Sequence, residues 1–152
     1  MMSDDLAKLL DYEAIRNVKA RYCRFLDTKD WDGFIGLFTA DAVLDVEEDT
    51  GQPPFIGHEA IRKTIIWSVE NAKSAHQIHM SEIDLQGDEA HVVTPMQDRV
   101  VWAPGTSPLP GAASITGFGH YHERYVRQDG QWKIASLKLT RLYVEVHPAP
   151  VL

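Results

Sequence analysis

RFLDTKDWDGFIGLFTADAV, residues 24–43, is the stretch that decides the fold. It starts in an apolar helix that ends near Asp27, crosses a polar turn containing Trp31 and a second short helix, and runs into a strand. The helix is predicted to begin at Asp11, because apolar residues recur at three- and four-residue spacing and form one stripe. The stripe consists of Ile15, Val18, Tyr22 and Leu26. A helix of this kind packs its stripe against a core.

The segments that follow alternate between helix and strand signals. Asp30 precedes a periodic apolar run and can cap the short helix. A strand is expected near Val43 to Val46, and the acidic segment from Glu47 to Pro54, which contains Gly and Pro, is predicted to be a loop. A third helix is expected to begin at Gly57. Its buried side would carry Ile61, Ile65, Ile66 and Val69.

In the second half of the chain the pattern changes to the two-residue period of strands. Gly87-Asp88 is a turn signal, and Asp129-Gly130 predicts a hairpin between strands at 115–127 and 131–146. The segment Ala103 to Ala113 holds three prolines and two glycines, so we expect a long loop there, and a candidate lid. The clearest alternation places on one face Met96, Asp98, Val100 and Trp102. Helices first and antiparallel strands after predict an α+β domain whose curved sheet wraps the helices.

Two segments, Asp27 to Ala42 and Tyr121 to Ile134, resemble the nuclear transport factor 2-like superfamily in its SnoaL-like branch. The order and spacing of their motifs carry the resemblance, which extends over nearly the whole chain. It implies a single cone-shaped domain at residues 11–147, with N-terminal helices packed in a strongly curved antiparallel sheet. An N-terminal tail at 1–10 and a C-terminal tail at 148–152 would flank it.

Composition and charge exclude several functions. A chain of 152 residues fits one domain. The net charge of -7 opposes binding to nucleic-acid phosphates, and every apolar run is far shorter than a membrane span needs. The start MMSDD lacks the regions of a secretory signal, and the lone Cys23 cannot form an internal disulfide. We therefore expect a cytoplasmic protein that binds neither nucleic acid nor membrane.

Asp27 and His76 are the first candidates for a catalytic pair. His76 shares strand parity with Ile78 and Met80, which should turn it inward, although a single histidine on an apolar face is more often a core residue. Asp27 alone could equally be an exposed helix-terminal acid or a cap. The SnoaL-like resemblance implies a pocket-facing aspartate and a catalytic histidine at these positions. If Asp27 accepts the Nδ1 proton of His76, the other ring nitrogen becomes a positioned base.

Three further polar residues fall on apolar faces. Tyr22 lies on the helix stripe, Asp98 on the alternating strand and Arg141 on the last strand. Each also has a structural explanation: a core side chain, a buried acceptor, and the salt-bridge partner of that acceptor. Together with Asp27 and His76 they resemble the set of the bile-acid 7α-dehydratases of this superfamily, in the same order and at similar intervals.

Two other members of the superfamily resemble the chain less closely. Scytalone dehydratase shares the aspartate and the histidine, but its two further tyrosines correspond to Leu26 and Val46 here. Hexachlorocyclohexane dehydrochlorinase resembles the chain through the aspartate and histidine alone. The pair therefore indicates a general eliminating base rather than a particular substrate.

Candidate substrate contacts are Trp31, Trp102 and Tyr121. Tyr121 shares its strand face with Gly117 and Gly119. Glycines at these positions leave room for a ligand or for a close backbone, and a β-bulge would explain them equally well. Glu123 lies on the same face, and the sequence assigns it no role.

The sequence indicates no cofactor. His120 and His122 lie close together, but no carboxylate or cysteine at ligand spacing completes a metal site. There is no P-loop and no dinucleotide-binding glycine motif.

These residues predict a cofactor-independent lyase that removes water from a hydroxylated, apolar cyclic or steroid-like carbonyl substrate. His76 would abstract the proton, Asp27 would orient His76, and Tyr22 would protonate the departing hydroxyl. Asp98 and Arg141 would bind the substrate or hold the network. An isomerase, a polyketide-type cyclase and a non-catalytic binding module are the alternatives. The resemblance also implies a homo-oligomer, a trimer or a dimer.

Overall fold

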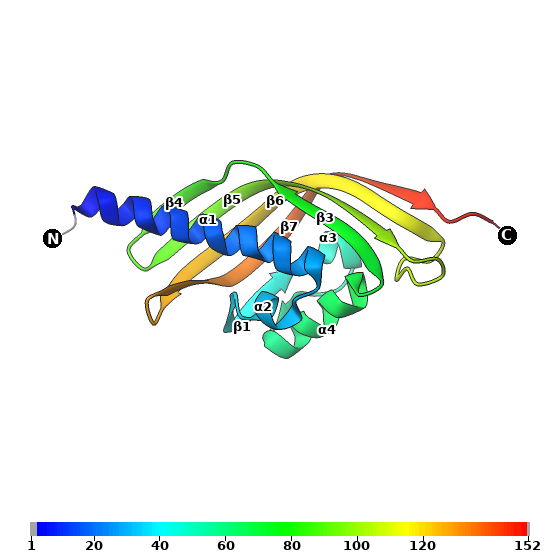
Figure 1. Ribbon diagram of the computed structural model, residues 1–152, viewed down its shortest axis with the longest axis horizontal. Helices are drawn as coiled ribbons and strands as arrows, with labels where there is room; N and C mark the ends of the chain where they lie inside the picture. The colour runs from blue at the N-terminus through cyan, green and yellow to red at the C-terminus, as the bar shows by residue number, and fades with distance from the viewer. Residues whose placement is uncertain (1–2, 152) are drawn as a thin grey trace.

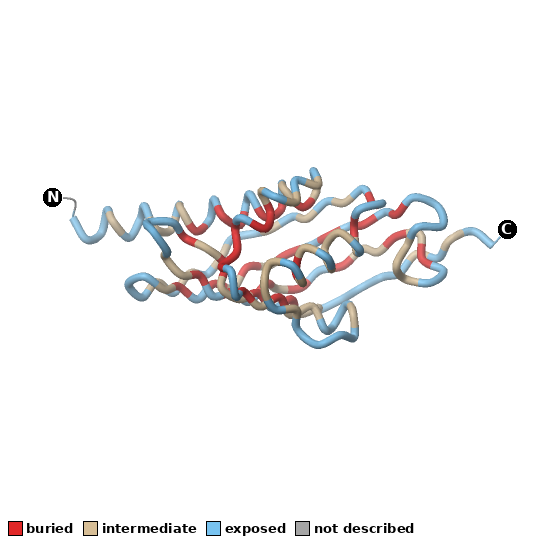
Figure 2. The backbone as a smooth tube through the Cα atoms, turned by 90° about the horizontal axis from the view of Figure 1, so that it is seen from below, coloured by how far each residue is buried: buried red, intermediate tan, exposed pale blue. Residues whose placement is uncertain are grey.

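A long N-terminal helix lies across a curved sheet in the computed structural model, which describes residues 3–151 (Figure 1). Helices α1 (Asp4–Thr28) and α4 (His58–Val69) pack on the sheet, and the short helix α2 (Trp31–Ile35) packs against both of them. Figure 2 shows the buried residues gathered along the surfaces where the helices and strands face one another. The predicted α+β class, with N-terminal helices packed in a curved and mainly antiparallel sheet, is confirmed. Within the described residues, no helix is long and apolar enough to cross a membrane.

Helix α1 begins well before the expected start at Asp11. The side chain of Ser3 caps it by accepting a hydrogen bond from the Leu6 N–H at 3.2 Å, and acidic residues fill the first turn. This part of the helix is largely exposed, so no apolar stripe marks it in the sequence. Three residues of the two expected tails, Met1, Met2 and Leu152, lie outside the described residues.

The sheet has the strand order β2-β1-β7-β6-β5-β3, and β4 pairs with β5. All pairs are antiparallel except β1 with β7. The strands are β1 (Phe38–Asp45), β2 (Phe55–Ile56), β3 (Ala72–Ile78), β4 (Glu82–Gln86), β5 (Glu89–Trp102), β6 (Ala112–Gln128) and β7 (Gln131–Pro148). The expected turns are present at Gly87-Asp88 and at Asp129-Gly130, where both residues of the hairpin turn have positive φ.

Two local expectations were wrong. The segment from Glu47 to Pro54 was expected to be a loop, but it contains the short helix α3 (Glu47–Thr50). A contact distant in the sequence supports this helix, because Arg141 binds Asp49. Met80 was expected to share the inward face of His76, but β3 ends at Ile78 and Met80 is 87% exposed.

Gly119 marks an irregularity between β6 and β7. The register shifts between Phe118 and Gly119, and a Cβ atom on Gly119 would lie 1.9 Å from the carbonyl oxygen of Thr140. On Gly117 a Cβ would lie 2.7 Å from the carbonyl oxygen of Tyr143 and 3.0 Å from Nη1 of Arg141. A bulge and a close backbone therefore explain Gly119, rather than space for a ligand.

Candidate functional site

A cavity of about 260 Å³ lies against α1, α3, α4 and the inner face of the sheet. Its apolar lining comes from Leu26, Val46, Ile65, Trp67, Val69, Val100, Trp102, Pro108, Leu109, Ile115 and Leu139. Its polar lining comes from Tyr22, Asp49, Thr50, Thr64, Ser68, His76, Asp98, Tyr121 and Arg141. An apolar cavity with a few convergent polar groups is the usual form of a small-molecule site.

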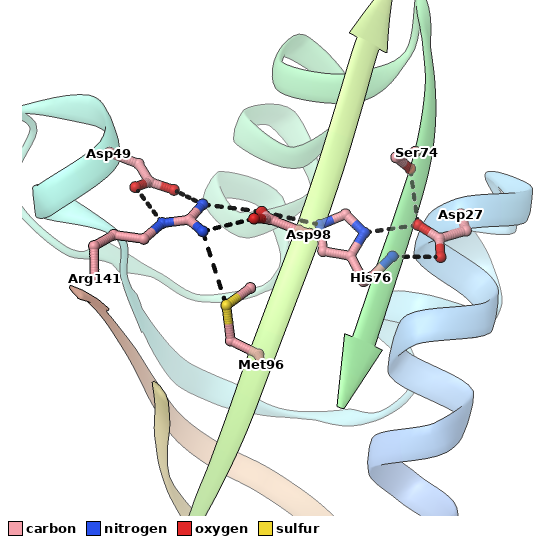
Figure 3. Close-up of polar contacts among 7 residues, drawn as sticks. All are labelled: Asp27, Asp49, Ser74, His76, Met96, Asp98 and Arg141. Carbon is pink, nitrogen blue, oxygen red and sulfur yellow. Dashed lines mark hydrogen bonds and ion pairs between the residues drawn. The ribbon is translucent and has the colours of Figure 1, made fainter. Parts of the chain in front are cut away.

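Asp27 and His76 are joined by two hydrogen bonds at the wall of this cavity (Figure 3). Nδ1 of His76 lies 2.6 Å from Oδ1 of Asp27, and the His76 backbone N–H donates to Oδ2 at 2.8 Å. The hydroxyl of Ser74 donates to Oδ1 of Asp27 at 2.8 Å. Because the ionised Asp27 carboxylate only accepts hydrogen bonds, Nδ1 carries the ring proton. Nε2 of the neutral ring is then unprotonated and can accept a proton.

The same donors keep Asp27 ionised. Asp27 lies in the last turn of α1, where the helix dipole disfavours a carboxylate. Burial raises the pKa of Asp27, but the hydrogen bonds from the ring and backbone of His76 and from Ser74 outweigh it and lower the pKa. Asp27 is outside the cavity lining, and His76 lies between it and the cavity.

Asp98 and Arg141 form a second cluster on the other side of His76 (Figure 3). The guanidinium donates to both oxygens of Asp98, at 2.7 and 2.9 Å, and to both oxygens of Asp49, at 2.9 and 2.8 Å. Burial lowers the pKa of Arg141, but the two carboxylates outweigh it, so the pKa is raised and the charge is fixed. Arg141 thus ties α3 to β5 at the edge of the cavity.

Tyr22 and Tyr121 line the cavity with their rings 5.7 Å apart in an edge-on arrangement. Burial, followed by the nearby Glu123 carboxylate, raises the pKa of Tyr22 well above its usual value. Burial raises the pKa of Tyr121 in the same way. Both hydroxyls therefore stay protonated and can donate hydrogen bonds to a ligand.

Of the two tryptophans expected to contact a substrate, one lines the cavity and the other does not. Trp102 lines it, and its indole Nε1–H donates to the Ser68 carbonyl at 2.9 Å. Trp31 does not line it, because Trp31 starts α2 and packs against the core there. Pro108 and Leu109 of the loop between β5 and β6 also contribute to the wall.

Sequence reasoning missed Ser74, Asp49 and Lys19. Ser74 precedes His76 by two residues on β3, so strand parity could have placed it beside Asp27. Lys19 lies four residues after Ile15 on the apolar stripe of α1, which marks a buried lysine. No local signal marks Asp49, since its partner Arg141 is distant in the chain. Glu123, left undecided above, is buried against Lys19 outside the cavity lining.

No group of three or more His, Cys, Asp or Glu side chains in the described part of the chain is arranged to hold a metal ion.

The architecture is that of a SnoaL-like protein. The family model described as "SnoaL-like domain" matches residues 7–138, and the chain belongs to that family. The superfamily resemblance drawn from the sequence is thereby confirmed.

The chain is also similar to particular proteins. "Probable cyclase FGR4" of Gibberella zeae is 28% identical over 138 residues, which cover 85% of this chain and 89% of the relative. The structure of Kfla4162 protein from Kribbella flavida superimposes with a TM-score of 0.81 at 22% identity, over 91% of this chain and 95% of the other. Hexachlorocyclohexane dehydrochlorinase LinA-type3 from Novosphingobium barchaimii LL02 superimposes with a TM-score of 0.76 at 19% identity, over 97% and 100%. At these identities the structural matches establish the shared fold.

Proposed function

We propose that the chain is a cofactor-independent lyase that removes water from a hydroxylated, apolar cyclic carbonyl compound. The observation that carries the proposal is the 2.6 Å contact between Nδ1 of His76 and Oδ1 of Asp27 at the wall of an apolar cavity. This contact orients the imidazole, leaves Nε2 as the base and stabilises the imidazolium that forms.

The proposed reaction is a β-elimination. Nε2 of His76 takes the proton from the carbon next to the carbonyl, and the electron pair moves onto the carbonyl oxygen to give an enolate. The enolate then reforms the carbonyl, a carbon–carbon double bond forms, and the carbon–oxygen bond to the hydroxyl breaks. Tyr22 supplies the proton that makes the leaving group water, and the proton on His76 restores Tyr22. Asp98, Arg141, Tyr121 and Trp102 hold the substrate or the network around it.

The size of the cavity favours a small substrate. A buried apolar cavity of about 150 Å³ in another protein binds benzene. The cavity of about 260 Å³ in this chain then suits one or two rings better than a complete steroid skeleton.

A cyclase is the second candidate, because a relative named a cyclase covers most of the chain. The same base would form an enolate that attacks a second carbonyl of the same molecule, with no loss of mass. A purely binding module is less well supported, since a ligand-binding wall does not need the Asp27–His76 hydrogen bond.

The test is a screen of one- and two-ring β-hydroxy ketones, with product masses read for loss of water. The wild type should give dehydrated products, and His76→Ala should form them about 10² to 10⁴-fold more slowly. Conversion without change in mass would favour a cyclase or an isomerase, and binding without conversion would refute the enzyme.

A further inference from the structure

A buried ion pair lies outside the set of residues assigned to the reaction. Nζ of Lys19 on α1 lies 3.2 Å from Oε2 of Glu123 on β6, and the two side chains are 2% and 0% exposed. Oε2 also accepts a hydrogen bond from the Tyr125 hydroxyl at 3.2 Å. Oε1 of Glu123 is the buried side-chain polar atom that has no hydrogen-bond partner within residues 3–151.

The ammonium group of Lys19 contacts two rings of the cavity wall. Nζ lies 3.6 Å from the ring centroid of Tyr22 and 3.5 Å from that of Tyr121. A cation within about 6 Å of an aromatic face is attracted by the ring, most strongly where water is excluded. The two rings therefore contact the cation and the ligand space at once.

Stability alone does not account for this pair. Burial lowers the pKa of Lys19 and raises the pKa of Glu123, and their mutual attraction offsets these two shifts only in part. Uncharged side chains of similar volume commonly replace such buried pairs without loss of stability. A role in the chemistry of the adjacent cavity is the better explanation.

We propose that Lys19 is a positioning residue that, through Tyr22 and Tyr121, makes their end of the cavity a site for a negatively charged oxygen of a planar cyclic ligand. Burial and the Glu123 carboxylate raise the pKa of Tyr22, and the cation over the ring face acts in the opposite direction. It withdraws electron density from the phenol, so the O–H donates a stronger hydrogen bond to an oxyanion than it would without Lys19. The inference rests on the proposed function in one respect, because the elimination develops negative charge at this end of the cavity, on the enolate oxygen that Tyr121 would bind and on the departing hydroxyl oxygen that Tyr22 would protonate.

The test compares two probes that differ in their ability to ionise. para-Nitrophenol can bind as the phenolate, whose visible absorbance reports its ionisation, whereas para-nitroanisole cannot ionise. Affinities of both are measured in the wild type and in the double variant Lys19→Met/Glu123→Gln, which removes both charges with little change in volume. The matched control is Arg124→Met/Glu89→Gln, which removes an exposed ion pair between the neighbouring strands β5 and β6.

The wild type should bind the phenolate more tightly than para-nitroanisole. In the Lys19→Met/Glu123→Gln variant the ratio of the two affinities should be about tenfold smaller. Its affinity for para-nitroanisole should be unchanged, which shows that the cavity is intact. The control should retain both affinities. An unchanged preference in the double variant, or a wild type that does not favour the phenolate or binds neither probe, overturns the inference.

The His76→Ala background separates this inference from the proposed function. A Lys19-dependent preference that persists in His76→Ala supports the oxyanion site independently of the base. If the wild type dehydrates no hydroxy ketone and yet shows this preference, the oxyanion site stands and the lyase is refuted.

Discussion

Nε2 of His76 lies 4.0 Å from Oδ2 of Asp98, whereas Nδ1 of the same ring lies 2.6 Å from Oδ1 of Asp27. Only the second distance is a hydrogen bond. Asp98 is bound instead to Arg141, so it does not compete for the proton-accepting nitrogen. The imidazole is thus fixed on one side and available on the other, as a general base requires.

The first prediction concerns this ring. His76→Ala should lower kcat/KM for the hydroxy ketone found by the screen by about 10² to 10⁴-fold, because the base is lost. Asp27→Asn should lower it less, since only orientation and charge are lost. Steady-state kinetics measure both, and circular dichroism checks that the variants fold. Full activity in His76→Ala would eliminate the acid/base mechanism.

The second prediction concerns the leaving group. Tyr22→Phe keeps the ring and removes the proton donor, so it should slow loss of hydroxide far more than loss of a halide from a matched substrate. The reason is that a poor leaving group needs protonation as it departs and a good one does not. Paired kcat values for the two substrates measure this. Equal losses would assign Tyr22 to binding or packing.

The third prediction concerns acid stability. The folded-state pKa of Asp27 is lowered, so its ionised form stabilises the fold fully above the unfolded value of about 3.9. This contribution is lost as the pH falls through the folded-state pKa. The free energies of unfolding of the wild type and Asp27→Asn should therefore differ at neutral pH and converge in acid, as measured by urea denaturation across a pH series. Parallel curves would contradict the assignment.

The fourth prediction concerns the buried pair. Lys19→Met alone leaves a buried carboxylate without its partner and should lower the free energy of unfolding by about 3 to 5 kcal/mol. The double variant Lys19→Met/Glu123→Gln should be as stable as the wild type or more stable, because the desolvation of both charges is avoided. Chemical denaturation measures both. Equal destabilisation in the single and double variants would show that the pair holds the core together.

The fifth prediction concerns α3. Arg141→Lys keeps the charge but lacks the planar fork that binds Asp49 and Asp98 together. Amide hydrogen exchange in Glu47–Thr50 should accelerate by about tenfold, because charge-assisted hydrogen bonds are lost. The control is Lys138→Met, on the same strand as Arg141, which removes a looser ion pair with Asp45 of β1. Unchanged exchange would mean that the guanidinium does not hold α3, and that packing and the hydrogen bond from the Arg141 backbone N–H to Glu48 are sufficient.

Local sequence patterns predicted most of the fold. The apolar stripe of α1, the alternation of β5 and the turn at Asp129-Gly130 each depend on neighbouring residues, and each is present. The patterns failed at α3 and at Met80, where a distant partner or the end of a strand decides the structure. Such tertiary effects leave no periodic signal.

The candidate site was predictable in part. Parity and resemblance together placed His76, Asp98 and Arg141 around one space, and the distances agree with that placement. The link from Arg141 to Asp49 depends on how α3 folds back onto β7, which spacing along the chain does not contain. Trp31 lies outside the cavity lining because it starts α2 and packs against the core, a placement that spacing along the chain also does not contain.

The close approach of Gly119 to Thr140, and of Gly117 to Arg141, also limits how this cavity can change in evolution. A methyl group at Gly119 would overlap backbone atoms, so a mutational library covering it would consist mostly of misfolded members. Ile65, Leu109 and Ile115 line the cavity without such a constraint. New ligand preferences would accordingly arise through those three positions, while the paired backbones of β6 and β7 beside Arg141 stay fixed.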